Sequence, residues 1–306
     1  MRKIPLIVIA GPTASGKTAL SVNIAKAVGG EIVSADSMQI YKYMNIGTAK
    51  PTDSEKQGIP HHMMDFLEPT VNFSVAEYCQ MAGEIIEDID KRGKIPVIVG
   101  GTGLYIDSLV RGVDFGEEEG DSKLRGELML LAENEGNEAV HKILAEIDPE
   151  TAAKYHPNNL RRIIRAIEVY KTQGKTVSQK EKEEKISPYD TVYFCINWDR
   201  SVLYDRINRR VDMMVEEGLI EEVKDLLNRD IDPGCTSMQS IGYKEFYGYL
   251  SGESGLDEAL DTIKQSSRRY AKRQLTWFRR NKEIHWLSPE NPLDEALGVI
   301  KEKFGI

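Results

Sequence analysis

The sequence has little cysteine and no long hydrophobic run. Its cysteines, Cys79, Cys195 and Cys235, are odd in number and widely spaced, so they give neither a disulfide framework nor a zinc-binding pattern. The longest apolar run near the start, Leu6 to Ala10, is far too short to span a membrane, and a signal peptide would not lead into a phosphate loop. We therefore expect a globular cytoplasmic protein without a membrane partner.

Acidic residues outnumber basic ones overall, but positive charge is concentrated locally. The net charge of −9 argues against a nucleic-acid partner. However, residues Lys264 to Lys282 contain eight Lys or Arg and no acid, and residues Asn159 to Lys171 form a second basic cluster. Such segments can bind a polyanion locally, and two solvated helix faces are the alternative.

Apolar runs and helical patterns alternate along the first and last parts of the chain. Helices are predicted over 17–28 and 75–92, between apolar runs that we interpret as strands at residues 5–10, 31–35, 95–101, 191–198 and 283–287. This alternation predicts an α/β fold, with a parallel sheet covered by helices on both faces.

The alternation stops in the middle of the chain. Residues 114–189 show helical patterns at 123–135, 138–146 and 159–172 and no strand pattern. We expect an inserted all-helical domain over 114–189, connected through 116–122 and 179–188, within a core domain formed by 1–113 and 190–306. The core would end in a helical part that starts with one helix over 202–227.

A complete phosphate-binding motif follows the first predicted strand. Backbone N–H groups of such a loop, the positive end of the next helix and a lysine together bind phosphate oxygens, and a hydroxyl can ligate Mg²⁺. Thr18 is the expected metal ligand. The expected diphosphate- or nucleotide-binding residues are Gly11, Pro12, Thr13, Ala14, Ser15, Gly16, Lys17 and Thr18.

The acid usual in ATP-hydrolysing relatives is missing after the strand at 95–101, which ends in glycines and Thr102. Asp36 follows the second strand instead. Because ligands bind at the carboxyl ends of strands in open α/β sheets, we expect Asp36 to take part in chemistry. Its alternative role is a turn or helix-capping residue.

Seven motifs in order resemble those of the tRNA dimethylallyltransferases, also called tRNA isopentenyltransferases. The resemblance extends from Ile9 to about Arg280, and its motifs are GPTASGKT, SADSMQIY, IGTAKP, VGGTGLY, RRIIRAIEV, SIGYKE and KRQLTWFR. It implies a nucleotide-kinase-like P-loop fold that transfers a dimethylallyl group from dimethylallyl diphosphate. The acceptor would be N6 of the adenosine 3′ of the anticodon in tRNA. The phosphate loop would hold the departing diphosphate, so no phosphoryl group would be transferred.

The resemblance also implies catalytic roles. Asp36 would accept the proton of the poorly nucleophilic amine. Lys17, Thr18 with Mg²⁺, and Arg210 would stabilise the charge on the leaving diphosphate. Arg210 precedes a hydrophobic-x-x-Met pattern typical of the family, and its neighbour Arg209 is the second candidate. Thr102 is expected to face the same crevice and to contact tRNA.

The partner would be a tRNA anticodon stem-loop, bound by a monomer, with its target base extruded into a channel. Arg161-Arg162 stands where the family often has Gln-Arg, which leaves a base-specific contact there open. Trp277 and Phe278 are as well suited to a helix core as to base stacking. The expected tRNA-binding residues are Asp36, Ser37, Met38, Gln39, Thr102, Arg125, Arg161, Arg162, Ile163, Ile164, Arg165, Gln239, Ser240, Ile241, Gly242, Tyr243, Lys244, Lys272, Arg273, Gln274, Leu275, Thr276, Trp277, Phe278 and Arg279.

Three other functions compete with this interpretation. An adenylate isopentenyltransferase would share the loop and Asp36 but needs neither the inserted helical module nor the basic C-terminal helix. A small-molecule kinase lacks its usual acid here, and a non-catalytic RNA-binding protein would not need Lys17, Thr18 and Asp36 together. The adjacent His61 and His62 are expected to be structural or to line the donor pocket, because adjacent side chains point to different faces and no third zinc ligand is present.

Overall fold

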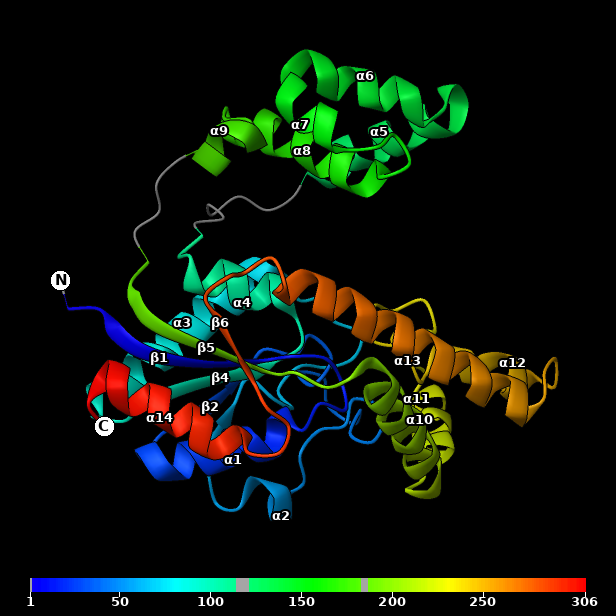
Figure 1. The fold of residues 1–306 in the computed structure, drawn as a ribbon. Helices are drawn as coiled ribbons and strands as arrows, with labels where there is room; N and C mark the ends of the chain where they lie inside the picture. The colour runs from blue at the N-terminus through cyan, green and yellow to red at the C-terminus, as the bar shows by residue number, and fades with distance from the viewer. Residues whose placement is uncertain (1, 114–120, 183–186) are drawn as a thin grey trace. The chain divides into compact units, whose positions relative to one another are not determined.

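A six-stranded parallel sheet forms the centre of the larger of two units in the computed structural model, which describes residues 2–113, 121–182 and 187–306 (Figure 1). The units are Met1–Val113 with Ser187–Ile306, and Asp114–Ile186. The strand order is β3-β2-β4-β1-β5-β6. The strands are β1 Ile4–Ala10, β2 Glu31–Ser34, β3 His61–His62, β4 Pro96–Gly100, β5 Tyr189–Ile196 and β6 Ile284–Leu287.

Helices cover both faces of this sheet, as the alternating pattern predicted. On one face, α3 Val75–Lys91 and α4 Gly103–Val110 pack on β1, β2 and β4. On the other face lie α1 Lys17–Val28 and α14 Pro292–Phe304. The short helix α2 Asp53–Lys56 lies in the loop that leads to β3. The α/β fold class is confirmed.

Local sequence signals explain where these helices begin and end. Ser74 and Glu77 form a capping box that satisfies backbone N–H groups at the start of α3. Gly29 ends α1 with a left-handed φ of 64°, a conformation that glycine adopts without the strain of a Cβ atom. The sequence therefore fixes α1 directly after the phosphate loop, which is what positions Lys17.

A helical part follows β5 in the same unit. Its elements are α10 Arg200–Glu216, α11 Leu219–Asn228, a 3₁₀ turn at Lys244–Phe246, α12 Tyr247–Ser251 and α13 Leu256–Phe278. The prediction of one helix over 202–227 is wrong. Gly218 adopts a φ of 102°, which breaks the helix and redirects α11 so that Leu219 and Val223 reach a separate core with Tyr41 and Met44.

The second unit is all-helical over its described residues. It contains α5 Ser122–Glu135, α6 Asn137–Ile147, α7 Pro149–Lys154, α8 Leu160–Gln173 and α9 Val177–Lys182. Leu128, Val140, Leu144 and Ile163 form its core. The short helices α7 and α9 were not predicted. Asp148 starts α7 by accepting from the Thr151 N–H and also accepts from the Ser178 N–H in α9.

Both predicted connections lie partly outside the described residues. In the segment 116–122, residues 116–120 lie outside the described residues, and in the segment 179–188, residues 183–186 do. Within the described ranges, no helix is long and apolar enough to cross a bilayer.

Candidate active site

The carboxyl ends of the central strands meet at one edge of the sheet. The register pairs Ala10 with both Gly100 and Cys195, and Ser34 with Val99. The loops after β1, β2 and β4 therefore begin side by side. They open into a cavity of about 410 Å³, which is lined by residues that include Thr13, Lys17, Thr18, Asp36, Ser37, Met38, Gln39, Gly47, Thr48, Ala49, His61, Met64, Val99, Ile207, Arg210, Val211, Met214, Gln239, Ser240, Ile241, Gly242, Lys244, Ile263, Tyr270, Arg273 and Gln274.

The phosphate loop between β1 and α1 is bent by three positive φ angles. Gly11, Ala14 and Gly16 have φ values of 150°, 61° and 89°. Gly16 is also the N-cap of α1 and has no side chain to satisfy the first N–H groups of that helix. These unsatisfied donors and the positive end of α1 are the physical basis of anion binding.

Lys17 extends from the first turn of α1 into this cavity. Its ammonium donates to the Pro12 carbonyl at 3.2 Å. Burial lowers the pKa of Lys17 to about 8, Arg210 adds to the lowering, and the carboxylate of Asp36 opposes it. A charged lysine here lacks much of its hydration, which favours binding of an anion that restores the missing electrostatic stabilisation.

Arg210 projects from α10 into the same cavity and has no ion pair or hydrogen bond within the described parts of the chain. Burial lowers its pKa, and the neighbouring Asp36 counteracts this. Arg209, by contrast, is exposed and does not line the cavity. Since a half-buried guanidinium without a partner is costly, Arg210 is the better of the two arginines for holding an anionic ligand.

Asp36 lies just beyond β2, opposite these cations. Its Oδ1 accepts from the Met38 N–H at 2.9 Å, so it does act in a turn, and its other oxygen has no hydrogen bond among the described residues. The hydroxyl of Thr102 accepts from the Ser37 N–H at 3.0 Å and lies 3.3 Å from the Ser37 hydroxyl. Thr102 thus contacts the Asp36 loop from behind, and the residues lining the cavity do not include it.

Sequence reasoning did not single out Tyr270, and it assigned Gln274 only to tRNA. Both lie on α13 and line the cavity. Gln274 accepts from the Thr13 N–H at 3.2 Å and donates to the Gly101 carbonyl at 2.9 Å, so it joins the phosphate loop to the loop after β4. Burial raises the pKa of Tyr270 to about 12, and Asp36 contributes in the same direction. Tyr270 is therefore a neutral hydrogen-bonding group beside the carboxylate.

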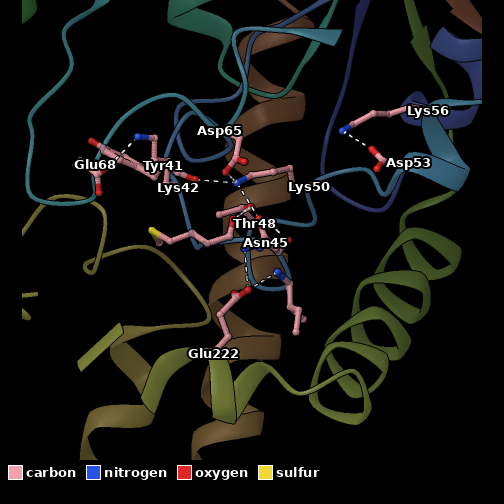
Figure 2. Close-up of polar contacts among 12 residues, drawn as sticks. Tyr41, Lys42, Asn45, Thr48, Lys50, Asp53, Lys56, Asp65, Glu68 and Glu222 are labelled. Carbon is pink, nitrogen blue, oxygen red and sulfur yellow. Dashed lines mark hydrogen bonds and ion pairs between the residues drawn. The ribbon is translucent and has the colours of Figure 1, made fainter. Parts of the chain in front are cut away.

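The loop between β2 and α2 forms another wall of the cavity (Figure 2). Glu222 of α11 accepts from the N–H groups of Asn45, Ile46 and Gly47 at 2.8, 2.8 and 3.0 Å. Lys50, whose side chain is 7% exposed, donates to the Tyr41 carbonyl at 2.8 Å and to Asp65 at 2.6 Å.

Gln39 completes this arrangement from the other side. Its amide donates to the carbonyls of Thr48 and Ala49 at 3.2 and 3.0 Å. The Tyr243 hydroxyl donates to Glu222 at 2.7 Å, and its ring lies so close to Gly47 that a Cβ there would approach it to 2.5 Å. Glu222, like Lys50, was not predicted, because its importance depends on contacts far apart in the sequence.

The remaining tRNA candidates of the larger unit differ in accessibility. Gln239, Ser240, Ile241, Gly242, Lys244 and Arg273 line the cavity, and Lys272, Thr276 and Arg279 are exposed. Tyr243 and Phe278 are buried, and Leu275 packs beside the core of α10. Trp277 packs on Gly103 and donates to Asp107 at 2.9 Å. These four side chains are therefore part of the packing of the unit.

The candidates of the helical unit divide in the same way. Arg161 and Arg162 are exposed, whereas Ile163 and Ile164 belong to the core. Arg125 and Arg165 both pair with Glu168, whose side chain is fully buried. Both arginines remain about half exposed, so the pairing orients them without removing them from the surface.

The two adjacent histidines point to different surroundings. His62 contacts Glu31 at 2.8 Å, whereas the His61 Nδ1 lies 2.8 Å from the Ile59 carbonyl and its side chain lines the cavity. Among the described residues no group of three or more His, Cys, Asp or Glu could hold a metal ion. A Mg²⁺ ion at this site would depend on the Thr18 hydroxyl, substrate oxygens and water, which suits its preference for hard oxygen ligands.

The parallel sheet covered by helices on both faces defines an α/β protein of nucleotide-kinase-like fold, with a cavity lined by opposite charges at the carboxyl ends of its strands. The chain matches the IPP transferase family over residues 39–281 and the isopentenyl transferase family over residues 4–72. It is 51% identical over 293 residues to a tRNA dimethylallyltransferase of Bacillus licheniformis, with 95% of this chain and 93% of that relative covered. The corresponding Bacillus subtilis protein is 49% identical, with 96% and 94% covered.

Solved structures lead to the same family. A tRNA isopentenylpyrophosphate transferase of Bacillus halodurans is 46% identical, with a TM-score of 0.75 and 98% and 97% of the two chains covered. A eukaryotic dimethylallyltransferase acting on tRNA is 32% identical, with a TM-score of 0.86 and 98% and 79% covered. The protein therefore belongs to the IPP transferase family, as the motifs predicted.

Proposed function

We propose that the protein transfers a dimethylallyl group from dimethylallyl diphosphate to N6 of the adenosine 3′ of the anticodon in tRNA, releasing diphosphate. The observation that carries the proposal is the pairing of charges in one cavity. A phosphate loop with Lys17 shares this cavity with Arg210 and with the carboxylate of Asp36. Among the described residues, Arg210 has no ion pair or hydrogen bond, and only one Asp36 oxygen accepts a hydrogen bond. The curated relatives are named tRNA dimethylallyltransferases, which supports transfer of a dimethylallyl group to tRNA.

The charges define the two halves of the reaction. The N6 lone pair forms a bond to C1 of the donor while the C1–O bond breaks, and its electron pair stays on the diphosphate. Lys17 and Arg210 stabilise that charge, and the N–H groups of the loop hold the phosphates. The proton released by N6 moves to the free oxygen of Asp36. Arg210 is the proposed diphosphate ligand in preference to Arg209.

Magnesium fits the residues of this site. The Thr18 hydroxyl lines the cavity beside Lys17 and makes no hydrogen bond within the described ranges of the chain. We propose that Thr18 would hold Mg²⁺ together with diphosphate oxygens, where the ion would neutralise phosphate charge. The surrounding residues orient the donor and the acceptor whether or not the ion is bound.

The acceptor end of the cavity is proposed to receive an extruded adenosine. Ser37, Met38, Gln39 and Gln239 line the cavity with Asp36, and Thr102 fixes the Ser37 loop from behind. The exposed cations Lys272 and Arg279, with Arg161, Arg162, Arg125 and Arg165 of the helical unit, are the proposed phosphate contacts. Residues 114–189 would then be a tRNA-binding domain.

We propose that the protein acts as a monomer. Because tRNA is the proposed acceptor, the expected place of action is the cytoplasm.

A transfer assay with labelled dimethylallyl diphosphate tests the proposal. Unmodified tRNA with adenosine next to its anticodon is offered beside AMP and ATP, with Mg²⁺ present. We expect label in tRNA alone. Label in the free nucleotides would indicate an adenylate isopentenyltransferase, and ATP consumption without label transfer would indicate kinase chemistry. Either result would overturn the proposal.

A further inference from the structure

Two side chains outside the cavity hold the back of the phosphate loop. Arg206 of α10 donates its Nε–H to the Ala14 carbonyl at 2.8 Å. Trp198, between β5 and α10, donates its indole N–H to the Ser15 carbonyl at 2.8 Å. The guanidinium of Arg206 stacks over the Trp198 ring at 4.4 Å, so each donor fixes the position of the other. Neither residue lines the cavity.

These two bonds determine where the loop directs its own donors. In a planar trans peptide the C=O of one residue and the N–H of the next point in opposite directions. Holding the Ala14 carbonyl toward Arg206 therefore turns the Ser15 N–H away from Arg206. Holding the Ser15 carbonyl toward Trp198 likewise turns the Gly16 N–H away from Trp198. Ala14 has a φ of 61°, which is strained for a residue with a Cβ atom and has to be maintained by surrounding contacts such as these.

The same helix carries the candidate ligand of the diphosphate. Arg206 and Arg210 are four residues apart on α10, so their side chains leave the same face one turn apart. Arg206 contacts the back of the loop, and Arg210 enters the cavity in front of it. A shift of α10 would therefore move the loop and the unpaired arginine together.

We propose that Arg206 and Trp198 are positioning residues that set the phosphate loop in its anion-binding conformation and couple it to Arg210. This inference rests on the proposed function, because it takes the diphosphate of the donor as the anion. It predicts that loss of either side chain weakens donor binding while tRNA binding is unaffected.

The full-length protein and three variants test this coupling. Arg206→Lys keeps the charge but loses the stacked, planar donor. Trp198→Phe keeps one aromatic ring but loses the indole N–H and the second fused ring. Arg200→Ala is the matched control. Arg200 lies on the same helix and stacks over Tyr204 at 5.1 Å, but no contact joins it to the loop within the described residues. The measurements are KM for dimethylallyl diphosphate, Kd for tRNA, and competitive inhibition by inorganic diphosphate at one pH.

We expect Arg206→Lys to raise the donor KM and the diphosphate inhibition constant about tenfold, as for a lost hydrogen bond to a charged group. Trp198→Phe should change both in the same direction by a smaller factor. Arg200→Ala should change neither, and tRNA Kd should stay constant throughout. Donor KM values no higher than that of Arg200→Ala would overturn the inference.

Melting temperatures show whether each variant folds, and Trp198→Phe provides the test if Arg206→Lys does not fold. If the unmodified protein fails to transfer the dimethylallyl group, the proposed function has failed. Direct binding of inorganic diphosphate then still decides whether Arg206 and Trp198 position the loop.

Discussion

The titration of Lys17 provides a quantitative test of the electrostatics of the cavity. Burial lowers the pKa of Lys17 to about 8, Asp36 opposes this, and Arg210 adds to it. Removing Asp36 should therefore lower the Lys17 pKa, and removing Arg210 should raise it. A charge in close contact shifts a pKa by about one to three units, so we expect Asp36→Asn to lower the Lys17 pKa by about one unit and Arg210→Ala to raise it by a smaller amount.

The assay is an NMR titration of the protein with ¹³C-labelled lysine, without donor or tRNA. The signal that is missing in Lys17→Arg identifies the residue. We expect a midpoint near pH 8 in the unmodified protein, well below the ordinary 10.5. A midpoint near the ordinary lysine value, or movement of both variants in the same direction, would refute the electrostatic reasoning.

The same pKa predicts how donor binding responds to pH. The lowered pKa means that the ammonium form is complete below about pH 8 and is lost as the pH rises through that value. If the diphosphate binds the ammonium form, donor affinity without tRNA should be constant below pH 8. It should fall about tenfold per pH unit above it. Lys17→Arg should remove this dependence, because arginine stays charged over the whole range.

Further predictions concern single side chains. Asp36→Ala should fold and bind tRNA but lose most transfer; a nearly normal rate would remove Asp36 as the base. Arg210→Ala should lower kcat about 10²- to 10³-fold, as expected for loss of one preorganised donor, with tRNA Kd unchanged, and the matched Arg209→Ala should have little effect. The reverse pattern would make Arg210 an RNA contact. Glu222→Gln should reduce kcat/KM about tenfold because it removes a charged acceptor from three loop N–H groups; an unaltered rate would mean that the loop keeps its shape without it. Hydrogen bonding from Arg92 lowers the pKa of Glu31 well below its usual value. The Glu31 carboxylate therefore stabilises the fold at pH values above its unfolded-state pKa. This stabilisation is lost as the pH falls below that value. Urea unfolding should show Glu31→Gln less stable by about 3–5 kcal/mol at pH 7, with the difference shrinking from pH 5 to pH 3; a constant difference would contradict this assignment.

The strands of the sheet were predictable because each central strand is a short apolar run that ends in a loop. The two-residue strand β3 at His61–His62 was not, since a segment of that length has no periodicity. The predicted helix over 202–227 failed at Gly218, where a tertiary core for Leu219 outweighs the continuous helical pattern. Gly218, a glycine inside the helical pattern, was the sequence signal for this helix break, and the prediction overlooked it.

Within the site, motif spacing was sufficient for residues that follow a strand directly. Lys17 was identified from the phosphate-loop motif, and Asp36 because strand ends converge at one edge. The structure places both in the cavity with Arg210. Their catalytic roles stay predictions. Arg206 and Glu222 could not be identified from the sequence, because each contacts backbone groups that are far away along the chain. Arg206 and Ala14 are 192 residues apart, and Glu222 and Asn45 are 177 residues apart.

Motif membership also overstated how many residues can face RNA. A motif combines exposed and buried positions of one helix, and only the helical period distinguishes them. In KRQLTWFR, Lys272 and Arg273 are exposed, whereas Phe278 is buried. In RRIIRAIEV the arginines are exposed, whereas Ile163 is buried. The cations remain the proposed tRNA contacts, and the apolar residues hold the helices that carry them.

The central claim is that this cavity joins a dimethylallyl group to a tRNA adenosine and releases diphosphate. The most direct measurement is mass spectrometry of the anticodon-loop fragment after reaction, together with quantification of the diphosphate released. The account predicts one dimethylallyl group on N6 of the adenosine 3′ of the anticodon and one diphosphate per group, with both products lost in Asp36→Ala. Modification at another nucleotide, or diphosphate release without modified tRNA, would contradict it.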